Sequence, residues 1–68
     1  MPPKNREVEA VLRDYGYAFK DQVGSHRHFE HSVTGLKVTI VGAPGDEMRR
    51  GTLRALLKYA RIPRKRGW

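Results

Sequence analysis

The sequence predicts an α+β fold with the order α-β-β-β-α, in which two helices cover one face of a three-stranded antiparallel sheet. Two observations lead to this fold class. Segments with helical spacing of apolar residues lie near both ends of the chain, and three short alternating segments lie between them. With 68 residues the chain makes one small domain. We expect this domain to span residues 1–68, with its core in 5–62 and a basic tail over 63–68.

A first helix is expected over residues 5–15. Its apolar residues recur at i, i+3, i+4 and i+7 and so share one face: Val8, Val11, Leu12 and Tyr15. Asn5 is the predicted N-cap, because its side chain can accept a hydrogen bond from the first turn. Gly16 follows where a left-handed residue closes a helix.

Three strands are expected next. The segment 17–20 alternates aromatic side chains, and Asp21 to Ser25 is expected to form the turn that follows it. Residues 27–31 form the predicted second strand. A hairpin turn at 32–35 leads into a third strand at 36–41, where Leu36, Val38 and Ile40 alternate with polar residues.

The last helix is expected from about residue 49 to residue 60, after a glycine-rich loop at 42–45. Its apolar stripe consists of Leu53, Leu56, Leu57 and Ala60. At about 100° per residue, four cations fall in one narrow sector beside that stripe: Arg50, Arg54, Lys58 and Arg61. Pro63 is expected to end the helix, and the basic segment after it is expected to be a mobile tail.

Charge is divided unevenly along the chain, whose net charge is +7. Residues 1–47 hold six Lys/Arg and seven Asp/Glu, whereas residues 48–68 hold eight Lys/Arg and no acid. This asymmetry indicates an anionic partner: nucleic acid, an acidic protein or an anionic membrane. The alternative is a basic surface that serves only solubility. There is no cysteine for a disulfide or thiolate site. The chain shows neither a membrane-spanning run nor a signal peptide, so we expect a cytoplasmic protein.

The second strand follows a Gly24-Ser25 turn that can bring backbone N–H groups close to a phosphate. If Phe29 faces the core, alternation places His28 and Glu30 on the open face of the sheet, and His26 too if the strand is regular that far. Arg27 and His31 then lie on the Phe29 side, near its margins.

Three interpretations of these histidines compete. His26 could be a general acid/base, because RNA cleavage without a metal needs a group that takes the 2′-OH proton and help for the leaving 5′-oxygen. Alternatively, His26, His28 and His31 could bind a metal together with Glu30. Third, they could simply be exposed histidines on a polar face. Composition alone favours the third interpretation.

Several motifs together resemble one family. They are Gly24-Ser25-His26 with Phe29, then Val38-Thr39-Ile40, then Gly51-Thr52-Leu53-Arg54 with Leu57-Lys58. In this order and spacing, over about residues 5–62, the chain resembles the HicA (YcfA-type) toxins. The resemblance implies a double-stranded-RNA-binding-domain-like fold and a type II toxin–antitoxin pair. It also implies an mRNA interferase activity without metal, held inactive by a HicB-type acidic antitoxin.

The family's catalytic histidine carries over to His26. We expect the RNA-binding residues to be Gly24, Ser25, Arg27, His28, Arg50, Arg54 and Lys58, with no cofactor and no metal. The family often has a further histidine after the third strand, but here the stretch 41–47 has none. The usual glycine after the last helix is Arg61. The alternative function is a non-catalytic RNA-binding module, and a metal-binding domain is a third hypothesis.

Overall fold

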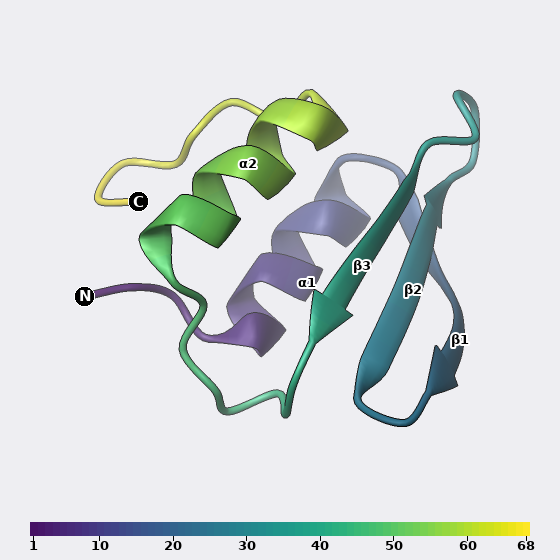
Figure 1. Ribbon diagram of the computed structural model, residues 1–68. Helices are drawn as coiled ribbons and strands as arrows, with labels where there is room; N and C mark the ends of the chain where they lie inside the picture. The colour runs from purple at the N-terminus through teal and green to yellow at the C-terminus, as the bar shows by residue number, and fades with distance from the viewer.

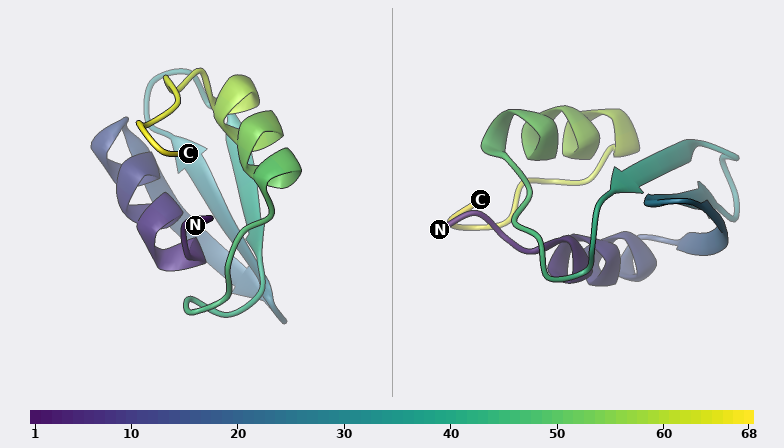
Figure 2. Two further views of the ribbon diagram at one scale, coloured as in Figure 1. Left: turned by 90° about the vertical axis from the view of Figure 1, so that its left-hand side faces the viewer. Right: turned by 60° about the horizontal axis from the view of Figure 1, so that its bottom comes forward.

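The computed structural model describes residues 1–68 and confirms the predicted fold class (Figure 1). The elements in chain order are α1 (Asn5–Asp14), β1 (Tyr17–Val23), β2 (His26–His31), β3 (Lys37–Val41) and α2 (Arg50–Ala60). The sheet is antiparallel in the order β1-β2-β3, and both helices lie on one of its faces (Figure 2). With 10 and 11 residues, the helices are too short for a membrane span, which needs about 20.

The N-terminus of α1 differs from the prediction, because Asn5 is not the N-cap. Lys4 occupies that position, and its backbone N–H donates to the Glu7 carboxylate (3.3 Å). Asn5 is the first helical residue and is buried. Its side-chain amide donates to the backbone oxygens of Val41 and Ala43, both at 3.0 Å. Asn5 therefore fastens the start of α1 to the loop that leaves β3.

The hairpin of β1 and β2 is longer than predicted. Val23 pairs with His26, so the turn consists of Gly24 and Ser25 alone, and the prediction of a turn over residues 21–25 is wrong. Gly24 has φ of 58°, which a two-residue hairpin turn requires and glycine adopts without strain. The register shifts between Phe19 and Asp21, where Lys20 forms a β-bulge. Because Val23 pairs with His26, β2 begins at His26, one residue earlier than predicted.

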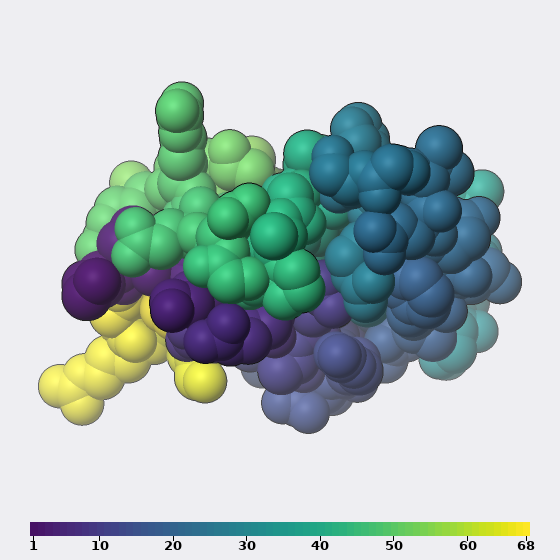
Figure 3. All heavy atoms as spheres, turned by 90° about the horizontal axis from the view of Figure 1, so that it is seen from below, coloured from purple at the N-terminus to yellow at the C-terminus, as the bar shows by residue number.

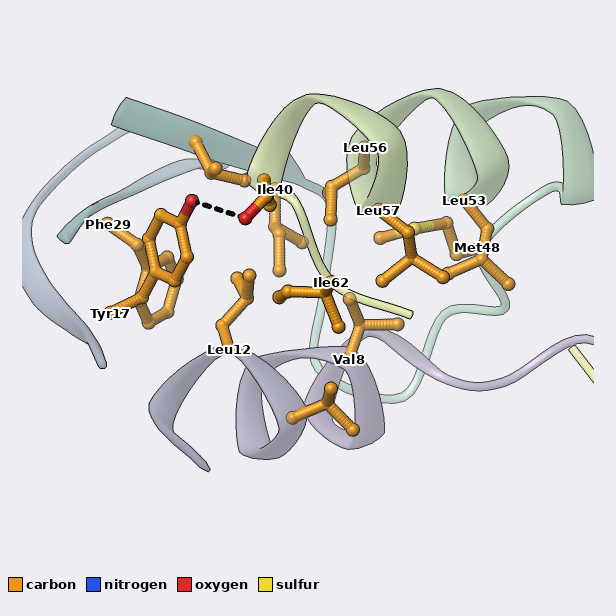
Figure 4. Close-up of a cluster of buried hydrophobic side chains, with 13 residues drawn as sticks. Val8, Leu12, Tyr17, Phe29, Ile40, Met48, Leu53, Leu56, Leu57 and Ile62 are labelled. Carbon is orange, nitrogen blue, oxygen red and sulfur yellow. Dashed lines mark hydrogen bonds between the residues drawn. The ribbon is translucent and has the colours of Figure 1, made fainter. Parts of the chain in front are cut away.

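The core contains thirteen apolar side chains between the sheet and the two helices (Figure 4). At its edge the buried Tyr17 hydroxyl donates a hydrogen bond of 2.9 Å to the backbone oxygen of Ala60, which links β1 to the end of α2. Burial raises the pKa of Tyr17 above its ordinary value, because the phenolate would lose its hydration.

The C-terminal segment, which the sequence suggested is a basic tail, runs back along the helices (Figure 2). After α2, Arg61 adopts a left-handed conformation with φ of 60°, and the chain reverses. Figure 2 shows the segment running back between the two helices, on the side away from the sheet. Ile62 is buried and Trp68 packs on the core, so an apolar anchor holds each end of the segment.

Candidate functional site

The open face of the sheet carries the histidines of β2. Strand alternation and register place His26, His28 and Glu30 on this face, which we name the open-face stripe. Each residue of the stripe lies between partners on β1 and β3. Because the strand is regular from its first residue, the expected placement of His26 beside His28 is confirmed.

His26 is the most exposed part of the stripe. It is the first residue of β2, directly after the turn, and its neighbours across the sheet are Val23 and Val41. Both valines are more than half exposed. No side-chain hydrogen bond or ion pair holds the His26 imidazole. Its two ring nitrogens are therefore free to meet a ligand.

His28 is held in place. Its Nδ1 lies 2.9 Å from the Thr39 hydroxyl, and it borders a hollow of about 300 Å³ on the open face. The β-bulge contributes to this hollow, because it brings two consecutive side chains, Lys20 and Asp21, to its lining. Lys20 forms an ion pair of 3.3 Å with Glu30. The hollow thus offers charges of both signs beside an oriented imidazole.

The β1–β2 turn lies against the loop after β3. The N–H of Gly42 donates to the backbone oxygen of Ser25 (2.9 Å), and the two segments line a hollow of about 390 Å³. Viewed from this end, the turn and the loop form a continuous surface (Figure 3). Gly24 and Ser25 are exposed there, so a phosphate can approach the turn that precedes His26.

Arg27 lies on the helix side of the sheet, as expected from alternation. Its Nε and Nη2 donate to the two carboxylate oxygens of the buried Glu9 at 2.8 and 3.1 Å, and its Nη1 donates to Gln22 at 2.8 Å. The guanidinium also lies over the Phe19 ring, 4.5 Å from its centre. Arg27 therefore joins β2 to α1, a role that the sequence reasoning missed.

His31 does not join the other histidines. It packs edge-on against Tyr17 at 5.0 Å, and its Nδ1 accepts backbone N–H bonds from Val33 and Thr34 at 3.0 and 3.1 Å. Its Nε2 lies so close to Gly16 that a Cβ there would be only 2.8 Å away. The imidazole organises the β2–β3 turn, so the histidines occupy opposite faces and form no cluster of three metal-ligating groups.

The cations of α2 lie apart from the open-face stripe. Arg50, Arg54 and Lys58 are exposed along one flank of the helix, and the two hollows beside them are lined by α2 and the C-terminal segment alone. Figure 3 shows the C-terminal segment and the β1–β2 turn at opposite ends of the molecule. The structure therefore separates the two groups of residues that the sequence suggested for RNA binding.

Comparison with known proteins identifies the family. A family model described as "HicA toxin of bacterial toxin-antitoxin" matches residues 6–62, which is most of the chain and includes all of the fold's helices and strands except Asn5, the first residue of α1. No curated protein matches the chain. The chain belongs to the HicA toxin family, and its role is that of the toxin in a toxin–antitoxin pair.

Proposed function

We propose that this toxin is an endoribonuclease that cleaves mRNA in the cytoplasm without a metal ion, with His26 as its general acid/base. The observation that carries the proposal is the His26 imidazole itself. It is exposed, free of hydrogen bonds and positioned by a regular strand directly after a glycine turn. An imidazole can both accept and donate a proton near neutral pH, which is what cleavage through the 2′-OH requires.

The chemistry follows from this placement. Neutral imidazole takes the proton of a 2′-OH while the 2′-oxygen attacks the adjacent phosphorus. The bond from phosphorus to the 5′-oxygen breaks, and that oxygen takes up a proton. The products are a 2′,3′-cyclic phosphate and a 5′-OH end. His28 lies on the same face two residues along the strand, about 7 Å away, and its ring is oriented by Thr39. We assign it to the RNA contacts beside His26, where it can also serve in the second proton transfer.

The proposed RNA contacts form two groups. Close to His26, the backbone of Gly24 and Ser25 meets phosphate, and Arg27 contributes the two of its five N–H groups that Glu9 and Gln22 leave free. On the helix side, phosphates farther along the RNA strand are contacted by Arg50, Arg54 and Lys58. Arg27 also positions β2, so its substitution affects both binding and folding.

The antitoxin partner is proposed to be an acidic protein of the HicB type. Residues 48–68 carry eight cations and no acid, and none of these cations forms an ion pair with an acidic side chain of the chain. An acidic surface is attracted to such a region. We expect inhibition by covering of His26 and the cations of α2.

The test is cleavage of a defined mRNA by the wild type and by His26→Ala, with Val33→Ala as a control at an exposed position outside the stripe. The proposal predicts cyclic-phosphate ends from the wild type and the control, and a rate lower by about 10²- to 10⁴-fold for His26→Ala. Equal cleavage by folded His26→Ala contradicts the assignment.

The second candidate function is a non-catalytic RNA-binding module. The separation of the α2 cations from His26 favours it, because a binding surface then exists that needs no catalytic group. In the same experiment this alternative predicts that the wild type binds the mRNA and leaves it intact.

A further inference from the structure

A cationic hollow lies between α2 and the C-terminal segment, on the side of the helices away from the sheet. Its volume is about 570 Å³. Five of its seven lining residues are cations and none is acidic: Arg50, Arg54, Arg64, Lys65, Arg66, Gly67 and Trp68. None of these cations pairs with an acidic side chain, and Arg50 alone has a hydrogen bond within the hollow, to the Trp68 backbone oxygen, so the repulsion among the other four is relieved by counter-ions or by an anionic ligand.

The hollow also has an aromatic wall. Trp68 is half-buried against the core, which limits its freedom, and Arg50 donates a hydrogen bond of 3.3 Å to its backbone oxygen. The Lys65 amine lies 5.5 Å from the centre of the indole ring. A single ring held beside several cations matches the pattern of single-stranded nucleic acid sites, where bases stack on aromatic side chains and cations follow the backbone.

We propose that this hollow is an exosite for single-stranded RNA, in which a base stacks on Trp68 and the neighbouring phosphates contact Arg50, Arg54 and Arg64. The proposal rests on the proposed function only for the choice of RNA as the anion. Since the hollow lies on the far side of the molecule from His26, it holds the strand at a distance from the reacting bond. Its loss raises KM and leaves kcat unchanged.

The chain contains one tryptophan, so Trp68 fluorescence reports directly on this hollow. The titration uses His26→Ala, which prevents cleavage, and an oligouridylate of about 12 nucleotides, within the site sizes of single-strand binders. An abasic oligomer with the same number of phosphates and inorganic tripolyphosphate serve as the other two ligands. The proposal predicts that oligouridylate quenches Trp68, and that the abasic oligomer binds more weakly without quenching.

Substitutions in the hollow test whether its residues bind RNA. Trp68→Leu keeps an apolar anchor on the core but cannot stack a base, and it is expected to weaken binding of labelled oligouridylate at least fivefold. Arg64→Ala is expected to weaken binding and to flatten the salt dependence. Arg6→Ala, an exposed cation on α1, is the matched control and is expected to bind as the parent does.

Three outcomes are decisive. Binding of labelled RNA with no change in Trp68 fluorescence overturns the exosite, whether or not the wild type cleaves RNA. Equal quenching and equal competition by tripolyphosphate also overturn it, because the hollow then holds phosphate without a base. If oligouridylate quenches Trp68 as predicted while the wild type fails to cleave RNA, the exosite stands and the proposed nuclease function fails.

Discussion

The ion pair of Arg27 with Glu9 joins β2 to α1, and Arg27→Ala removes it. Two hydrogen bonds between charged groups are lost, each worth about 1.5–3 kcal/mol. Glu9, which is 4% exposed, keeps only Arg13 at 3.9 Å. Breaking a buried ion pair costs about 3–5 kcal/mol. Since the Arg27 side chain is 24% exposed, part of that cost is recovered by solvent, and we expect a loss of about 2–3 kcal/mol.

This loss is large for a chain of 68 residues, whose total stability is expected to be about 3–10 kcal/mol. In a domain of this size each kcal/mol shifts the midpoint of thermal unfolding by about 4–8 °C. Arg27→Ala is therefore expected to melt about 10–20 °C below the wild type. Circular dichroism at neutral pH measures the shift.

The control is Arg13→Ala, whose exposed i,i+4 contact with Glu9 is worth about 0.3–0.5 kcal/mol. A double-mutant cycle of Arg27→Ala with Glu9→Gln isolates the coupling between the two side chains. If Arg27→Ala has the same melting temperature as the wild type but binds RNA more weakly, the expected loss of stability is refuted. Arg27 then acts on the ligand and does not hold the fold together.

Four further predictions follow from the fold and the site. Tyr17→Phe is expected to lower the free energy of unfolding by about 1 kcal/mol at neutral pH. Because the folded pKa of Tyr17 is raised, its contribution is present below about pH 10 and is lost as pH rises through the folded pKa, so urea unfolding at alkaline pH is expected to show a smaller loss for this variant. Arg61→Gly relieves a left-handed non-glycine residue and is expected to gain about 0.5–1 kcal/mol in the same assay. Cleavage is expected to persist in EDTA, whereas loss of activity that one added metal restores supports metal catalysis instead. If about four cations contact phosphates, the logarithm of the binding constant for RNA is expected to fall with the logarithm of the salt concentration at a slope near −3, measured by fluorescence anisotropy. That slope should flatten on joint replacement of three residues: Arg50, Arg54 and Lys58.

Periodicity was sufficient to predict the order of the helices and strands and most of their buried faces. The apolar stripes of both helices are buried as expected except for Tyr15, which is the C-cap of α1 and is 46% exposed, and Val38 and Ile40 face the core. Periodicity fails where the backbone departs from regularity. The bulge at Lys20 inserts one residue into β1 and so interrupts the alternation of side chains. A prediction that assumes regular alternation cannot locate such an insertion.

The missed contacts are those that depend on residues distant in sequence. Asn5 looked like a helix cap, since caps are local, but its partners are 36 and 38 residues away. Glu9 offered a signal, because it lies among the apolar residues of α1 and a buried carboxylate needs a partner. The identity of that partner, Arg27, depends on how α1 packs on the sheet.

The candidate site could be predicted only where it depends on the local sequence pattern. Strand alternation is local, so the exposure of His26 and His28 could be predicted. The position of the α2 cations relative to His26 could not be predicted. A helical projection shows that these cations share one side of the helix, but it does not show what that side faces in the fold. The packing of the C-terminal segment likewise depends on the distant contact of Trp68 with the core.

The proposed nuclease function requires that His26 carries out the chemical step of RNA cleavage. Its most direct test is the single-turnover rate at saturating RNA, since this rate separates chemistry from binding. We expect His26→Ala to lower this rate by about 10²- to 10⁴-fold, while its melting temperature and its Kd for RNA stay at the wild-type values. A folded His26→Ala protein that binds RNA normally and cleaves it at the wild-type rate would contradict the claim.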